Sequence, residues 1–145
     1  KARHAATAFD GDGARLYGGR WNSRGLAVVY TAASPALAAL ELLVHLGNSN
    51  ALARYVSIAC RFDEALVLRL DRQRLPRQWQ SSPAVPELAL VGDAWLKDGT
   101  SAVLAVPSAI IPAESNYLLN PNHADFGSIE IGTAQPFELD QRLLR

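Results

Sequence analysis

The first residues in this sequence that could bind a ligand form the segment Gly18-Gly19-Arg20-Trp21-Asn22. Two glycines allow a tight turn, and the planar guanidinium of Arg20 can bind a phosphate through two hydrogen bonds. Trp21 offers a surface on which a flat ring could stack, and Asn22 offers an amide. The alternative is a surface turn with a solvated arginine and a tryptophan folded into the core, because most arginines are exposed.

A tyrosine and a glutamate follow on the next two predicted elements. Tyr30 ends the apolar run 28–30 (VVY), where a tyrosine either packs in the core through its ring or stacks on a flat heteroaromatic ligand. Glu41 lies at the edge of a predicted helical stripe, and glutamate is seldom buried without a partner. Its carboxylate either reaches solvent or lies in a cleft, where it would stabilise positive charge or accept a hydrogen bond from a hydroxyl.

The remaining polar candidates are a histidine, a serine and a cluster near a proline turn. His45 follows Glu41 by one helical turn, but two ligands do not make a zinc site and no HExxH or CxxC is present, so we expect no metal. Ser108 follows an apolar run without a GxSxG motif, which favours a hydrogen-bonding serine over a hydrolase nucleophile. The cluster near the proline turn comprises Glu114, Asn116, Asn120 and His123. We attribute most of it to turn formation.

The elements that must position these residues follow from apolar spacing. Residues 26–32 (LAVVYTA) are typical of a strand. Ser34-Pro35 then favours the start of a helix that continues to about Leu46. Residues 10–25 hold five of the ten glycines and are expected to form an irregular loop. The predicted inward stripe of the helix is Leu37, Leu40 and Val44.

The rest of the chain predicts short strands and one further helix. Residues 87–98 have helical spacing and end at Gly99, whereas 55–62 alternates like one half-buried strand, which makes Cys60 structural. Strands outnumber helices and do not interleave with them regularly. We therefore predict an α+β fold with a mixed or largely antiparallel sheet and flanking helices. The other predicted strands are 65–70, 102–106, 115–119, 129–133 and 136–139, with a proline-rich connection at 72–86.

Length and composition fit one domain spanning residues 1–145. The chain is 49% hydrophobic and 19% charged, and its 14 Lys and Arg residues balance 14 Asp and Glu residues. This balance provides no general attraction to nucleic acid or an anionic membrane. No apolar run approaches the roughly 18 residues of a membrane span. One cysteine and no apparent leader favour the cytoplasm, and the absence of methionine leads us to expect a trimmed N-terminus.

Two stretches of the chain resemble the RES-domain toxins of bacterial Xre–RES toxin–antitoxin pairs. They are residues 13–46 (GARLYGGRWNSRGLAVVYTAASPALAALELLVHL) and 102–126 (AVLAVPSAIIPAESNYLLNPNHADF), about two-fifths of the chain. The Arg, Glu and Ser that name this family fall on Arg20, Glu41 and Ser108. The additional active-site tyrosine of the family falls on Tyr30.

The resemblance implies a fold similar to the ADP-ribosyltransferases of the diphtheria-toxin type and NAD+ as the substrate. Arg20 would hold the diphosphate or the adjacent ribose, and Tyr30 would pack against nicotinamide. Glu41 would bind ribose hydroxyls and stabilise oxocarbenium-like charge, while Ser108 would orient Glu41 or bind substrate. Trp21 and Asn22 are further candidates for substrate binding, and His45 and Asn120 are candidates for supporting residues behind the reacting groups.

The implied function is a toxin that arrests growth by cleaving the nicotinamide–ribose bond of NAD+, through hydrolysis or phosphorolysis. One alternative is transfer of ADP-ribose to a protein such as a nucleotide-biosynthesis enzyme. An alternative of another class is a noncatalytic nucleotide-binding or protein-interaction module. A ribonuclease is disfavoured, because no basic stripe with interleaved aromatics is present. The implied partners are an Xre-family helix–turn–helix antitoxin and a second copy in a homodimer.

Overall fold

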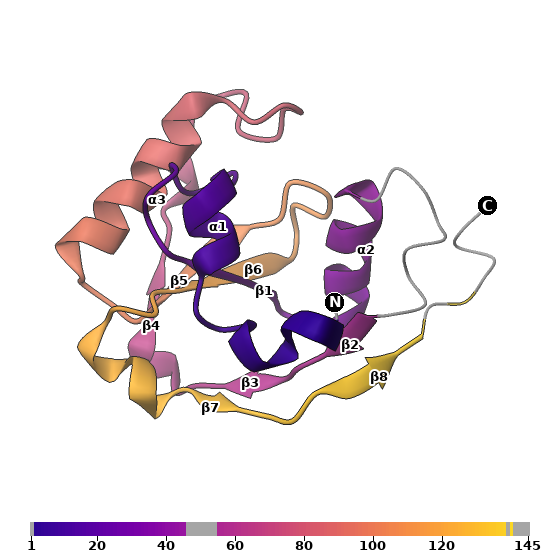
Figure 1. Cartoon of the computed structure of the whole chain (residues 1–145). Coiled ribbons are helices and arrows are strands. Elements are labelled where there is room, and N and C mark those ends of the chain that lie inside the picture. Colours follow the sequence, from indigo (N-terminus) through magenta and orange to yellow (C-terminus); the bar gives the residue numbers. More distant parts are fainter. Residues whose placement is uncertain (1, 46–54, 139, 141–145) are drawn as a thin grey trace.

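A four-stranded sheet of order β1-β6-β5-β4 forms the centre of the molecule in the computed structural model, which describes residues 2–45, 55–138 and 140 (Figure 1). The pairs β1·β6 and β6·β5 are antiparallel, whereas β5·β4 is parallel. The mixed sheet confirms the predicted α+β class. Its strands are β1 (Val29–Ala32), β4 (Val67–Arg69), β5 (Val103–Pro107) and β6 (Ser115–Leu119).

Two further strand pairs form beside the central sheet. The sequence predicts a single strand over 55–62, but the structure divides it into β2 (Tyr55–Ser57) and β3 (Cys60–Arg61). Each half pairs antiparallel with a different part of the extended C-terminal segment, β2 with β8 (Gln135–Phe137) and β3 with β7 (Glu130–Ile131). The continuous alternation of the sequence therefore describes one extended segment whose pairing is interrupted.

The helix α2 (Pro35–His45) begins where the sequence predicts, with the Ser34 hydroxyl accepting a hydrogen bond from the Leu37 N–H at 3.1 Å. Its buried face differs from the predicted stripe. Leu37 is buried, but Leu40 is 38% exposed and Val44 is 62% exposed. The physical reason is that α2 packs beside β1, an edge strand, so the sheet covers only one side of the helix.

The glycine-rich segment 10–25 contains a short helix, α1 (Asp12–Tyr17), where the sequence predicts only irregular backbone. Gly11 and Gly18 flank this helix, each with a φ of 73° that favours glycine. A Cβ on Gly11 would also lie 2.7 Å from the backbone nitrogen of Val28. Short 3-10 helices complete the described structure: η1 (Ala2–Thr7), η3 (Glu64–Leu66), η4 (Arg72–Arg74) and η5 (Ala124–Ser128).

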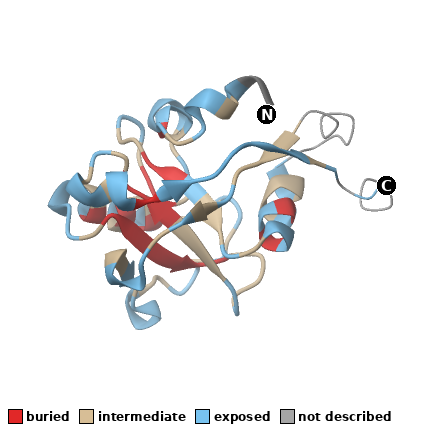
Figure 2. Ribbon diagram, turned by 90° about the horizontal axis from the view of Figure 1, so that it is seen from below, coloured by how far each residue is buried: buried red, intermediate tan, exposed pale blue. Residues whose placement is uncertain are grey.

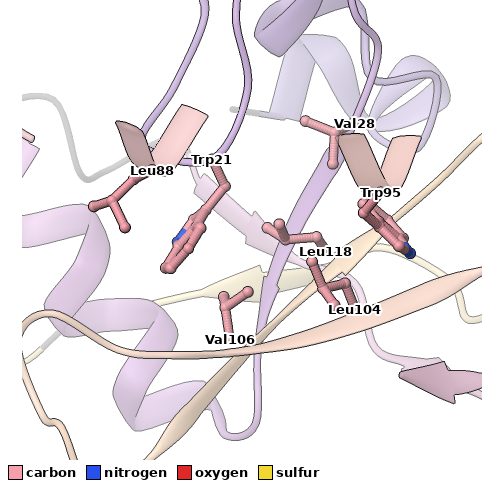
Figure 3. Close-up of a cluster of buried hydrophobic side chains, with 7 residues drawn as sticks. All are labelled: Trp21, Val28, Leu88, Trp95, Leu104, Val106 and Leu118. Carbon is pink, nitrogen blue, oxygen red and sulfur yellow. The ribbon is translucent and has the colours of Figure 1, made fainter. Parts of the chain in front are cut away.

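The helix α3 (Pro86–Asp98) confirms the prediction for 87–98 and ends at Gly99, which has a φ of 58°. It covers one face of the central sheet, in which β5 is buried along its whole length (Figure 2). No helix in the described part of the chain is long and apolar enough to cross a membrane. The cluster beneath α3 consists of Trp21, Val28, Leu88, Trp95, Leu104, Val106 and Leu118 (Figure 3).

A second apolar cluster contains the alternate residues of the same strands. Successive side chains of a strand point to opposite faces of a sheet. Val103 and Leu119 therefore belong to this cluster, while their neighbours Leu104 and Leu118 lie beneath α3. The sheet is thus covered on both faces. The second cluster consists of Val29, Ala102, Val103, Leu119 and Ile129.

The contact between α3 and the segment that carries Trp21 yields a stability prediction. A Cβ added at Gly92 would lie 1.8 Å from the Trp21 carbonyl oxygen. We expect Gly92→Ala to lower the free energy of unfolding by about 1–3 kcal/mol, although alanine favours helices. Urea denaturation measures the change. Gly127→Ala, which adds a Cβ with no atom within 4 Å, is the control, and equal stability of Gly92→Ala and wild type would contradict the packing.

Candidate active site

A cleft of about 920 Å³ lies between the turn after α1, strand β1, helix α2 and the segment 80–84. Arg20, Tyr30 and Glu41, which the sequence separates onto different elements, all line this cleft. Ser108 is buried directly behind it and donates a hydrogen bond to Glu41. The fold thus gathers the predicted Arg, Tyr, Glu and Ser around one cavity.

Arg20 is held at the cleft by backbone carbonyl groups. Its Nη1 donates to the carbonyl of Trp79 at 2.8 Å, and its Nη2 donates to that of Ser81 at 3.1 Å. These bonds use only part of the donor capacity of the guanidinium. The positive charge has no carboxylate partner among the described residues, so it remains available to an anionic group in the cleft.

Tyr30 presents its ring to the cleft while its hydroxyl is fixed. The hydroxyl donates to Asn22 Oδ1 at 2.8 Å and accepts from the Trp21 N–H at 3.0 Å. Burial raises the pKa of Tyr30 to about 12 against the opposing effect of the Trp21 hydrogen bond, so the phenol is neutral at physiological pH. The residue as a whole is still 41% exposed. An anchored hydroxyl and an open ring make a rigid stacking surface.

Trp21 and Asn22 support this surface from below. Asn22 is 1% exposed, and its Nδ2 donates to three carbonyl groups of the surrounding loop. The Trp21 side chain is 2% exposed and packs in the cluster beneath α3. The sequence predicts substrate contacts for both residues. Trp21 is among the residues that line the cleft, although its side chain packs in the core, whereas Asn22 is not. Both residues hold the Tyr30 hydroxyl through their hydrogen bonds to it.

Glu41 is held by two donors that bind the same oxygen. Ser108 Oγ donates to Oε1 at 2.9 Å, and Asn116 Nδ2 donates to it at 2.6 Å. The serine oxygen accepts the backbone N–H groups of Ile110 and Ile111, both at 3.1 Å, so its own proton points to Glu41. No hydrogen bond within the described residues reaches Oε2. The carboxylate is therefore fixed with one oxygen left for a ligand.

Asn116 is the residue of this site that sequence reasoning missed by assigning it to turn formation. It lines the cleft from β6, opposite Ala32 of β1 and Val106 of β5. A signal was present, since Asn116 precedes the buried Leu118 by two positions. The two-residue period of a strand places both on the same, inward face.

The two predicted supporting residues have different surroundings. His45 is exposed and lines the cleft one turn beyond Glu41. Asn120 lies beyond the opposite end of β6, where its Oδ1 accepts the Asn122 N–H at 3.0 Å. It is not among the residues lining the cleft, and its side chain stabilises a turn.

Within the described ranges no group of three or more His, Cys, Asp or Glu side chains is placed to hold a metal ion.

The anchoring of Tyr30 predicts both a stability loss and a pH effect. Tyr30→Phe leaves Asn22 Oδ1 and the Trp21 N–H unpaired, which costs about 1–3 kcal/mol of unfolding free energy. Raising the pH from about 10 to about 12 should destabilise wild type, because the unfolded tyrosine ionises before the folded one. This component should be absent from Tyr30→Phe and retained in the exposed control Tyr17→Phe. Urea denaturation across that pH range measures it, and identical pH dependence of all three proteins would contradict the buried hydroxyl.

Comparison with known proteins places this arrangement in a family. The RES domain model matches residues 1–140. A Yersinia enterocolitica protein named Toxin Res is 38% identical over 143 residues, covering 97% of this chain and 93% of its own length. A Sphingobium protein named Prs ADP-ribosylating toxin is 37% identical over 145 residues, covering 98% and 90%. With a match along almost the whole chain and relatives of nearly equal extent, the protein belongs to the RES domain family.

Proposed function

We propose that this protein is a toxin that consumes NAD+ by breaking the bond between nicotinamide and ribose. The observation that carries the proposal is the Glu41 carboxylate, which Ser108 and Asn116 hold through one oxygen in the cleft shared with Arg20 and Tyr30. The names of the relatives support it, because ADP-ribosylation takes its ADP-ribose from NAD+. The cleft volume of about 920 Å³ suits a ligand of dinucleotide size.

Arg20 is assigned to the diphosphate. A protein with balanced charges has no long-range attraction for an anion, so the binding energy must come from local, charge-assisted hydrogen bonds. The guanidinium is already oriented by the carbonyls of Trp79 and Ser81. It therefore binds the phosphate oxygens with little loss of side-chain freedom.

Tyr30 is assigned to the nicotinamide ring. In NAD+ this ring is a pyridinium cation, and a cation above an aromatic face is attracted by the ring quadrupole. When the glycosidic bond breaks, its electron pair goes to the ring nitrogen and nicotinamide leaves as a neutral molecule. The fixed hydroxyl of Tyr30 keeps the ring of the tyrosine in place throughout.

Glu41 is assigned to the ribose. As nicotinamide leaves, positive charge develops at the anomeric carbon and the ring oxygen, as in glycoside cleavage. Oε2 of Glu41 accepts a hydrogen bond from a ribose hydroxyl, and the negative charge of the carboxylate stabilises the oxocarbenium-like state. A nucleophile then attacks the anomeric carbon and completes the reaction. Water or phosphate as this nucleophile gives the hydrolysis or phosphorolysis that we favour.

A second candidate function is protein ADP-ribosylation, which the name of the Sphingobium relative favours. Bond cleavage would be the same, but a side chain of a target such as a nucleotide-biosynthesis enzyme would attack the ribose. A noncatalytic nucleotide-binding or interaction module is the alternative without chemistry. We further propose that the toxin acts in the cytoplasm, forms a homodimer, and is neutralised by an Xre-family antitoxin that blocks the cleft.

Replacing the Glu41 carboxylate tests the proposal directly. Purified wild type should release nicotinamide from NAD+, and Glu41→Gln should release it about two to three orders of magnitude more slowly, because one preorganised electrostatic group is lost. Chromatography of free nicotinamide measures both rates. The control is Glu87→Gln, the same change on the exposed surface of α3. Equal rates for wild type and Glu41→Gln would refute the enzymatic function. Growth arrest on expression of wild type that is relieved in Glu41→Gln is not expected of a binding-only module.

The acceptor of ADP-ribose is tested with NAD+ labelled in its adenylate part and incubated with a bacterial lysate. We expect NAD+ to disappear without a labelled protein band, and phosphate to accelerate the loss if phosphorolysis operates. A labelled band that requires Glu41 would instead support the ADP-ribosyltransferase. Wild type and Glu41→Gln are compared in the same lysate, so labelling by endogenous enzymes is subtracted.

A further inference from the structure

Only one end of the Asn116 side-chain amide has a hydrogen-bond partner among the described residues. Its Nδ2 donates to Glu41 Oε1 at 2.6 Å, while its Oδ1 is buried and has no hydrogen-bond partner among the described residues. A buried amide oxygen without a donor carries a desolvation penalty. Rotating the amide would place this oxygen against the Glu41 carboxylate, so the orientation follows from the contact with Glu41.

The two donors to Glu41 come from strand β6 and from the residue that follows its neighbour, β5. Ser108 follows β5 directly, and Asn116 lies in β6, where its Cα pairs with that of Val106. Glu41 itself comes from α2, so both bonds cross from the sheet to the helix. One hydrogen bond allows a carboxylate to rotate about it, whereas two donors from separate strands fix its plane. The second donor is therefore what determines where Oε2 lies in the cleft.

We propose that Asn116 is a positioning residue for the NAD+ cleavage assigned above, acting by fixing the Glu41 carboxylate so that Oε2 meets the ribose. The inference rests on the proposed function and adds a residue to it. Its contribution is to the transition state more than to substrate binding, because the charge that Glu41 stabilises develops only as the bond breaks. Loss of Asn116 therefore lowers kcat more than it raises KM.

The first test removes the donor. Asn116→Leu keeps the approximate size of the side chain, and kcat for nicotinamide release should fall about 10- to 100-fold with a smaller change in KM, as expected for a lost hydrogen bond to a charged group. Asn122→Leu, at an exposed position of the turn after β6, is the control for a change of this kind. Thermal unfolding midpoints show whether each variant is folded at the assay temperature.

The second test uses pH, which a purely structural role would not affect. Asn116→Asp places a second carboxylate against Glu41 Oε1, and repulsion between the two negative charges makes the pair take up a proton at a higher pH than an isolated carboxylate. On acidification the pair binds one shared proton, which restores a donor to Oε1 and leaves Oε2 free. The activity of Asn116→Asp relative to wild type should rise several-fold from pH 8 to pH 5.5. That of Asn122→Asp relative to wild type should stay constant.

The outcomes separate the two proposals. If wild type is active and the folded Asn116 variants keep its kcat, the role of Asn116 is overturned and the proposed function stands. The same follows if the activity of Asn116→Asp relative to wild type does not change with pH. Wild type that releases no nicotinamide overturns the proposed function and the role of Asn116 with it. A reduced kcat in Asn116→Leu, together with activity of Asn116→Asp that returns at acidic pH, supports the proposed function and the role of Asn116.

Discussion

The site depends on holding a carboxylate still on a helix that the sheet covers from one side only. Glu41 lies on α2, which packs beside the edge strand β1, and a glutamate in such a place would ordinarily turn toward water. Hydrogen bonds from Ser108 and Asn116 prevent this by linking the helix to β5 and β6. The requirement explains why a polar asparagine occupies a position in β6, and a polar serine the position directly after β5, next to a buried apolar core.

A second constraint is the packing of α3 against the turn between α1 and β1, which carries Arg20 into the cleft. The α3 helix lies against the backbone of Trp21 at Gly92, and buried Asp93 accepts the Ser23 N–H at 2.8 Å. These contacts fix the turn between α1 and β1, and the Tyr30 hydroxyl closes the same turn from the strand side. Arg20 is thus positioned by packing on one flank and by the carbonyls of the 79–81 segment on the other.

Together the two constraints produce an electrostatically divided cleft in a protein without net charge. The guanidinium of Arg20, the carboxylate of Glu41 and the neutral ring of Tyr30 line the same cavity. Such a division suits a ligand that is anionic at one end and becomes cationic at a sugar carbon during reaction. Because these charges act over short distances in a partly desolvated cavity, they do not need help from the overall charge of the protein.

Local patterns in the sequence determined those features that depend only on neighbouring residues. The start of α2 after Ser34 and the end of α3 at Gly99 follow from capping and from the conformational freedom of glycine. The strands β5 and β6 follow from short apolar runs. The chemical types of the Arg, Tyr, Glu and Ser side chains also identified the candidates, because few residue types can bind phosphate, stack on a ring or stabilise a sugar cation.

Only the tertiary structure decided which of these side chains meet and what supports them. The division of 55–62 into two strands depends on pairing with a segment about 70 to 80 residues later, and the exposure of Leu40 depends on α2 lying at a sheet edge. The part played by Asn116 depends likewise on a partner from a distant segment, Glu41 of α2. A side-chain amide donates equally well in a turn, a core or a cleft, so its role is set by contacts that spacing along the chain does not contain.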